Sequence, residues 1–137
     1  MNGGEFSYYT DYDQEHALDA NGPNGVSLAE AARECCISFV IGDGQSDYVT
    51  ADALAAAGRL LGYALAIEDA VILDDRVTIT IRNSGCAVIP YHLYAAFGTV
   101  QSAQSLKGLL PGETRDLTIT ITDHDPADFH FTSPALL

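Results

Sequence analysis

The segment Arg76-Val-Thr-Ile-Thr-Ile-Arg-Asn83 decides the fold class of this chain, because the segment Asp116-Leu-Thr-Ile-Thr-Ile-Thr-Asp123 repeats its pattern. In both segments apolar and polar residues alternate with a period of two, which places the aliphatic side chains on one face of a strand. Such strands belong to an antiparallel sheet with one buried face and one solvated face. We therefore expect Ile79 and Ile119 to lie in the interior of a β-sandwich.

Further segments with strand character surround these two and are separated by turn residues. They are Tyr63–Ile67, Ala70–Leu73, Val88–Phe97 and Asp128–Thr132. Leu109–Glu113 contains Pro followed by Gly, the order that suits the two central positions of a type II turn. Five or six short strands divided by turns predict a small immunoglobulin-like β-sandwich over residues 63–137.

Residues 1–62 are expected to form loops and two helices. Ser27 and Glu30 have the S-x-x-E spacing of a capping box, in which each side chain accepts a hydrogen bond from the other residue's backbone N–H. Thr50 is placed to cap the second helix. The predicted fold class is therefore α+β, an antiparallel sandwich over residues 63–137 with two N-terminal helices packed on it.

The charge balance of the chain disfavours polyanionic partners. A length of 137 residues suits about one domain, and 6 basic residues against 19 acidic ones give a net charge of −13. Nucleic acids and anionic membrane surfaces are bound mainly through Lys and Arg, so neither is an expected partner. We interpret the acidity as a solvated surface that keeps the protein soluble. Adaptation to high salt, or cation binding, is the alternative.

Neither a membrane span nor a signal peptide is predicted. No run of 18 or more apolar residues is present, and the first residues lack a basic region followed by an apolar one. We expect either a cytoplasmic protein or a piece of a longer chain. Cys35 and Cys36 are adjacent, which disfavours a bridge between them, so reduced thiols are expected. A bridge from Cys86 to one of the pair stays open.

No cofactor and no metal ion is predicted. The chain contains no P-loop, no G-x-G-x-x-G, no G-x-S-x-G and no H-E-x-x-H. Three alternating carboxylates over residues 11–15 resemble the start of a calcium loop, but His16 and Gly22 stand where that loop needs Gly and Glu. The acids and histidines of residues 123–130 match no strong metal template. Both segments are interpreted as polar loops.

Two groups of residues remain as candidates for function. Glu5 follows two glycines at a possible strand end, where a carboxylate serves glycoside hydrolysis only if a second carboxylate lies opposite. Tyr91, His92 and Tyr94 lie on or beside one expected strand, one face of which belongs to the core. The other face suits an aromatic platform for sugars, although the chain has no Trp. Ordinary core or edge packing of these rings is the alternative.

Several short motifs in order along the chain resemble one family. They are Gly3-Gly-Glu5, Ile37–Gln45, Leu61-Gly-Tyr63, Asn83-Ser-Gly-Cys-Ala87 with Pro90-Tyr91, and Leu106–Glu113. With these motifs the chain resembles an uncharacterised bacterial domain family (domain of unknown function 4832). Its members form the C-terminal part of secreted or surface proteins built on a glycoside-hydrolase-like barrel, which implies an extracellular location.

The resemblance implies that residues 1–62 correspond to the last barrel segment and residues 63–122 to an appended immunoglobulin-like sandwich. Glu5 would then lie near the C-terminal face of the barrel, where active sites form. The preceding barrel strands are not in this chain, so this segment alone does not assemble two opposed carboxylates.

The expected function is a non-catalytic accessory module of a carbohydrate-active protein, either structural or weakly glycan-binding. Its partner would be a glycan or a neighbouring catalytic domain. One alternative is a fragment of a glycoside hydrolase with Glu5 as an active-site carboxylate. Another is a stand-alone protein-interaction domain that pairs through an exposed sheet edge.

Overall fold

The structure of this chain is a computed structural model, which describes residues 1–121 and 126–134. It divides the chain into two units. The first contains Met1–Tyr63 together with Gly85–Ala87, and the second contains Ala64–Ser84 and the described part of Val88–Leu137. Gly85–Ala87 therefore belongs with a unit from which it is distant in sequence. The division into domains at residue 62 stays a prediction.

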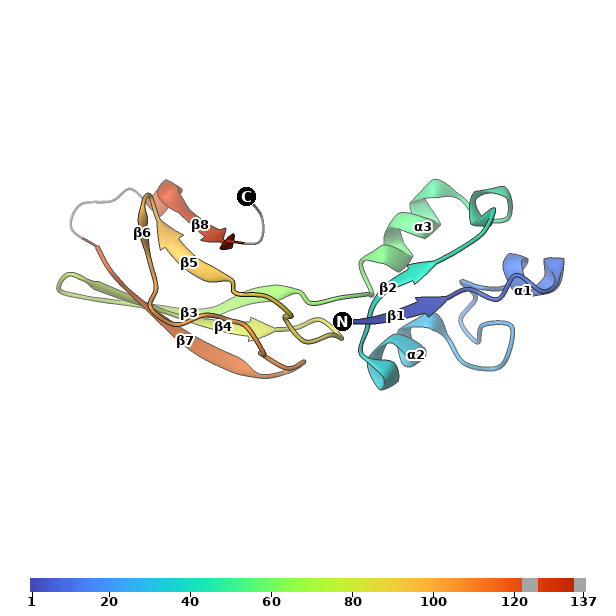
Figure 1. Cartoon of the computed structure of the whole chain (residues 1–137), viewed down its shortest axis with the longest axis horizontal. Helices are drawn as coiled ribbons and strands as arrows, with labels where there is room; N and C mark the ends of the chain where they lie inside the picture. The colour runs from blue at the N-terminus through green and yellow to red at the C-terminus, as the bar shows by residue number, and fades with distance from the viewer. Residues whose placement is uncertain (122–125, 135–137) are drawn as a thin grey trace. The chain divides into compact units, whose positions relative to one another are not determined.

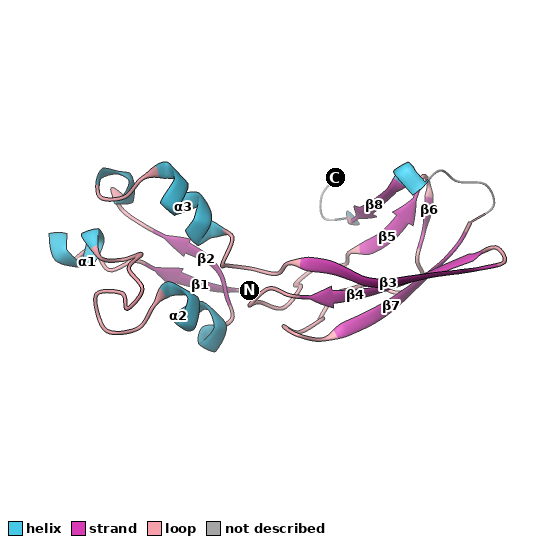
Figure 2. Cartoon of the chain, turned by 180° about the vertical axis from the view of Figure 1, so that it is seen from behind, coloured by secondary structure: helices cyan, strands magenta, loops and turns pink. Residues whose placement is uncertain are grey.

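The first unit is built on a parallel pair of strands, β1 (Asn2–Glu5) and β2 (Ile37–Ile41). Parallel strands need a crossover connection, which here contains the helices α1 (Asp11–Glu15) and α2 (Leu28–Cys35). A 3₁₀ turn, η1 (Gln45–Asp47), and helix α3 (Ala51–Gly58) follow β2. In Figures 1 and 2, α2 and α3 lie on opposite sides of the strand pair.

Both predicted helices are confirmed together with their N-terminal caps. The Ser27 side chain accepts from the backbone N–H of Glu30, and the Glu30 carboxylate accepts from that of Ser27 at 2.9 Å. Thr50 caps α3 by accepting from Ala53. The short helix α1 contradicts the loop predicted for the acidic residues 11–15, and Thr10 caps it by accepting from Asp13.

A small apolar cluster in the first unit contains Ala32 of α2, Ile37 of β2 and Cys86. Cys86 reaches this cluster because its backbone N–H and that of Ala87 both donate to the carbonyl of Gly62 at 2.9 Å. Its thiol donates to the carbonyls of Ile37 and Leu60. All three cysteines of the chain are free.

The second unit contains two antiparallel three-stranded sheets, visible as two layers in Figure 1. One has the order β3-β4-β7, with β3 at Leu65–Leu73, β4 at Arg76–Asn83 and β7 at Thr114–Thr120. The other has the order β6-β5-β8, with β5 at Tyr94–Phe97, β6 at Val100–Gln101 and β8 at Phe129–Thr132. A 3₁₀ turn, η2 (Pro126–Asp128), precedes β8.

The alternating segments form the strands that the sequence predicts, and their aliphatic faces are buried. Ile79 is 3% exposed and Ile119 is 1% exposed. These side chains belong to a core that draws on both sheets and the loops between them. Its other apolar members are Val77, Ile81, Ile89, Leu93, Ala95, Ala96, Leu106, Leu109 and Leu117. The structure thus confirms an α+β chain with antiparallel sheets.

Two strand predictions need correction. The predicted strand Val88–Phe97 is regular only from Tyr94 onward, and Pro90, which has no N–H for a ladder, lies in the irregular part. The predicted segments on either side of Glu68 and Asp69 form one strand, β3, whose register shifts between Ile67 and Asp69. A bulge of this kind leaves one extra residue, Glu68, without a register partner, and the strand stays paired with β4 on both sides of it.

Candidate functional site

Glu5 lies at the carboxyl end of β1, paired in register with Ile41 at the end of β2. The next residue, Phe6, continues this contact by donating its backbone N–H to the Ile41 carbonyl at 2.9 Å. The carboxyl ends of parallel strands are where ligands bind in open α/β sheets. The exposed Glu5 side chain is therefore at the end of the strand pair that suits a ligand.

Glu5 also lines a pocket of about 260 Å³ in the first unit. Much of the wall is apolar and comes from β1, α2 and β2, through Gly4, Leu28, Ala31, Ile37 and Val40. Among the described residues of the lining, Glu5 is the only one with a carboxylate. The pocket therefore presents one carboxylate beside an apolar wall rather than two opposed acids.

Two other carboxylates of the first unit are engaged in local structure. Asp13 accepts a hydrogen bond from the Ser7 hydroxyl at 2.7 Å. Glu30 is held in the capping box, where hydrogen bonds from the Ser27 backbone and hydroxyl lower the pKa of its carboxyl. These contacts give both acids a structural role in holding α1 and α2.

The candidate aromatic residues lie together in the second unit. The rings of His92 and Tyr94 are stacked, with centroids 6.0 Å apart and planes 9° from parallel. His92 Nδ1 lies 3.3 Å from the Tyr94 hydroxyl and 3.2 Å from Ser105 Oγ. Leu93, between the two rings in sequence, is buried, whereas His92 is exposed and Tyr94 is half-buried.

A network from three segments holds this region in place. The Ser133 hydroxyl donates to the His92 carbonyl at 2.5 Å. Arg115 of β7 donates through Nη1 to the carbonyls of Ser105 and Lys107, at 2.6 and 3.0 Å. Because one guanidinium holds both ends of that short loop, the loop is fixed beside the His92 ring.

Tyr91 and His92 line a small pocket of about 180 Å³. Its other walls are Pro90, Lys107, Ser133 and Pro134. Pockets for drug-sized ligands are typically about 300–1,000 Å³, so this one suits only part of a small polar ligand. Its lining combines aromatic rings, a cation and a hydroxyl.

In the described part of the chain, no group of three or more His, Cys, Asp or Glu side chains is arranged to hold an ion. Asp11, Asp13 and Glu15 lie on helix α1, where alternate residues point in different directions. The hydroxyl of Tyr48 donates to Asp11 at 2.8 Å, which raises the pKa of that tyrosine. Residues 123–125 of the second acidic segment lie outside the described residues.

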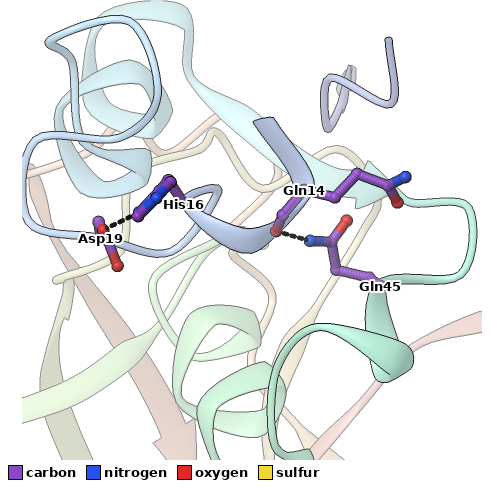
Figure 3. Close-up of polar contacts among 4 residues, drawn as sticks. All are labelled: Gln14, His16, Asp19 and Gln45. Carbon is purple, nitrogen blue, oxygen red and sulfur yellow. Dashed lines mark hydrogen bonds and ion pairs between the residues drawn. The ribbon is translucent and has the colours of Figure 1, made fainter. Parts of the chain in front are cut away.

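Figure 3 shows polar contacts that the sequence did not indicate. The buried side chain of Gln45 donates through Nε2 to the backbone carbonyl of Gln14 at 2.7 Å. Within the described residues, the side-chain oxygens of both glutamines are buried without a hydrogen-bond donor. Nearby, His16 Nδ1 lies 2.6 Å from an Asp19 oxygen. Gln14 and Gln45 follow β1 and β2, so their amides add polar groups beyond the strand ends.

Sequence reasoning missed Ser105, Lys107, Arg115 and Ser133 as neighbours of the candidate rings. They come from two loops and a strand that are separated from His92 in the chain, and no motif of the sequence links them to His92. Only the antiparallel pairing of β5 with β8, and the folding of the Ser105–Lys107 loop against Arg115, brings them together.

No described helix is long and apolar enough to cross a bilayer. Comparison with known proteins leaves the family open. The chain matches no protein-family model, and neither a curated protein nor a solved structure is significantly similar to it.

Proposed function

We propose that this chain is a non-catalytic accessory module of a carbohydrate-active protein, and that its second unit is an immunoglobulin-like sandwich that binds glycan weakly. The observation that carries the proposal is the stacked pair His92–Tyr94, with planes 9° apart, beside the pocket lined by Tyr91. Flat rings offer apolar faces to the C–H surfaces of a sugar while their polar edges stay hydrated. The partner is a glycan or a neighbouring catalytic domain.

The polar groups around the rings fit the same ligand. Lys107 and Ser133 line the pocket, and Ser105 lies within hydrogen-bond distance of His92. Convergent polar groups that fix orientation, beside apolar rings that supply contact area, are the usual composition of a small-molecule site. A pocket of about 180 Å³ holds about one sugar ring's edge, which accounts for weak rather than tight binding.

The test is titration of the chain with a panel of plant and microbial polysaccharides, followed by calorimetry. We expect binding to one class, with Tyr91→Ala and Tyr94→Ala each weakening it about tenfold, as loss of a central aromatic contact does. Tyr8→Ala and Tyr9→Ala are the matched controls. Tyr8 and Tyr9 form a second stacked pair in the first unit, with ring centroids 5.3 Å apart. Flat titrations with every polysaccharide would leave the module a purely structural role.

A second candidate function rests on the position of Glu5. An exposed carboxylate at the carboxyl end of a parallel strand, lining a pocket of about 260 Å³, suits an acid or base of a glycoside hydrolase. The second carboxylate would come from outside the described lining of this pocket. This candidate predicts activity in the natural protein that contains this segment.

Glu5→Gln tests that candidate, since it keeps the shape of the side chain and removes its charge. Hydrolysis of chromogenic glycosides by the natural protein would fall by about two orders of magnitude or more. Glu15→Gln is the matched control at an exposed acid of α1. An unchanged rate in Glu5→Gln would remove Glu5 from the candidates.

A further inference from the structure

Strand β3 is an open edge of its sheet. The sheet has the order β3-β4-β7, so β3 has a described neighbour on one side only. An edge strand presents a row of unpaired N–H and C=O groups that can pair with another chain. At nine residues, Leu65–Leu73 is also the longest strand of the described residues.

This edge carries apolar side chains on both faces of the sheet. Ile67 and Ile72 pair in register with the buried Ile81 and Val77, so they lie on the core side, yet they are 55% and 70% exposed. On the opposite face, Val71 and Leu73 are 53% and 70% exposed. Exposed apolar side chains on a long edge strand favour pairing of that edge with another chain.

The charges within the edge segment itself are all of one sign, and the basic residues nearby, Arg76 and Arg82, belong to β4. The segment Leu65–Asp75 contains Glu68, Asp69, Asp74 and Asp75 and has no basic residue. Of these four, only Glu68 has an ion pair in the described structure, with Arg82 at 3.2 Å and on the β4 side. Two copies of this chain paired through β3 would bring these carboxylates together, and like charges opposite each other destabilise a sheet.

We propose that the edge of β3 binds an extended segment of another protein by β-strand addition, and that this segment alternates basic and apolar residues. Main-chain hydrogen bonds along an edge supply affinity in such complexes, while the side chains supply specificity. Apolar side chains of the added strand would cover Ile67 and Ile72. Its Lys or Arg side chains would pair with Asp69 and with the acids of the β3–β4 turn.

The probe is a synthetic nine-residue peptide of alternating lysine and valine, blocked at both ends. Titration into the isotopically labelled chain, followed by amide NMR, should give saturable shifts concentrated in Leu65–Leu73, and binding should weaken with added salt. A peptide with glutamate in place of lysine should not bind. The same basic peptide, N-methylated at alternate backbone amides, keeps its charge and should lose binding, because it cannot form the ladder.

Substitutions on β3 complete the test. Ile72→Lys and Asp69→Lys each change an exposed side chain and should weaken the peptide about tenfold. Thr120→Lys is the control, since Thr120 is an exposed residue of β7 at the other edge of the sheet. Circular dichroism verifies that each variant is folded.

Three results would overturn the proposal. The first is equal binding of the N-methylated peptide, which would mean attraction by charge alone. The second is a set of shifts that map to β7 or to the first unit. The third is a dimer in sedimentation that Ile72→Lys dissociates, because the edge would then belong to a second copy of this chain.

Discussion

β3 and β7 flank the same strand, β4, but differ in the burial of the side chains that face the core. Val77 of β4 pairs with Ile119 of β7 on one side and with Ile72 of β3 on the other. Ile119 is 1% exposed, whereas Ile72 is 70% exposed. The residue type and the pairing partner are the same, so the difference comes from what lies over each strand. In this unit, the contacts of β7 include β5 and β6 of the second sheet, and the core side of β3 is left open.

Shortening the two isoleucines gives the largest expected contrast. Ile119→Ala removes buried methyl and methylene groups and leaves a cavity, which should lower the free energy of unfolding by about 2–5 kcal/mol. Ile72→Ala removes mostly solvated atoms, and its effect should stay within about 0.5 kcal/mol. Denaturant unfolding of both variants measures the difference. Equal losses would mean that a partner surface covers β3 in solution.

Asn83 at the end of β4 links the approaches to both flanking strands. Its side chain accepts from the N–H of Ala64, just before β3, and donates to the carbonyl of Leu109 at 3.1 Å. Asn83→Ala should lower the free energy of unfolding by about 1–3 kcal/mol, because both hydrogen bonds of this buried side chain are lost.

Ser84→Ala is the matched control for that variant. It removes an exposed hydroxyl that donates to the Ala64 carbonyl at 3.4 Å, so its effect should be small. A loss as large as that of Asn83→Ala would locate the constraint in the turn after β4 rather than in the Asn83 amide.

On the solvated face of the sheet, we expect a smaller difference in stability between variants of β7 and β3. Thr78 faces Thr118 of β7, with the two hydroxyl oxygens 3.2 Å apart, and it faces Val71 of β3 on its other side. Thr118→Val removes that hydrogen bond and should cost about 0.2–1 kcal/mol. Val71→Thr should change the stability by less, since no hydrogen bond is lost. The opposite ranking in thermal unfolding would show that β3 contributes more cross-strand stability than β7.

The smallest expected effect concerns the ion pair at the bulge of β3. Arg82 and Glu68 are 3.2 Å apart, with side chains 49% and 40% exposed, so solvent screens the pair. Arg82→Gln should lower the stability by less than about 1 kcal/mol, and the difference should shrink as salt is added. A large loss that is insensitive to salt would indicate that Arg82 acts through packing of its aliphatic stem.

Where local rules decide the structure, sequence reasoning was sufficient. The alternation in β4 and β7 and the caps at Ser27 and Thr50 depend on residues within a few positions of each other. The exposure of the core-side residues of β3 depends on which strands of the second sheet lie over them. The apolar run in the sequence of β3 gives no information about those neighbours. Helix α1 was missed because five residues give no periodicity to read.

In the candidate sites, too, contacts between residues close in sequence were predictable, and contacts between distant segments were not. His92 and Tyr94 are near each other because they are two residues apart, whereas Ser105, Arg115 and Ser133 reach this region only through tertiary pairing. The pocket beside Glu5, with Glu5 as the one carboxylate of its described lining, also depends on segments distant in sequence. Geometry that joins distant segments is therefore the part that the structure adds.

Gly85–Ala87 has a practical consequence for dissecting this molecule. Three residues from the middle of the chain complete the interior of the N-terminal unit, through Cys86 and the paired amides on Gly62. A truncation that stops at Tyr63 would therefore remove part of that interior and leave the Gly62 carbonyl without its two donors. Any recombinant study of the N-terminal half has to carry the first hairpin of the C-terminal half with it.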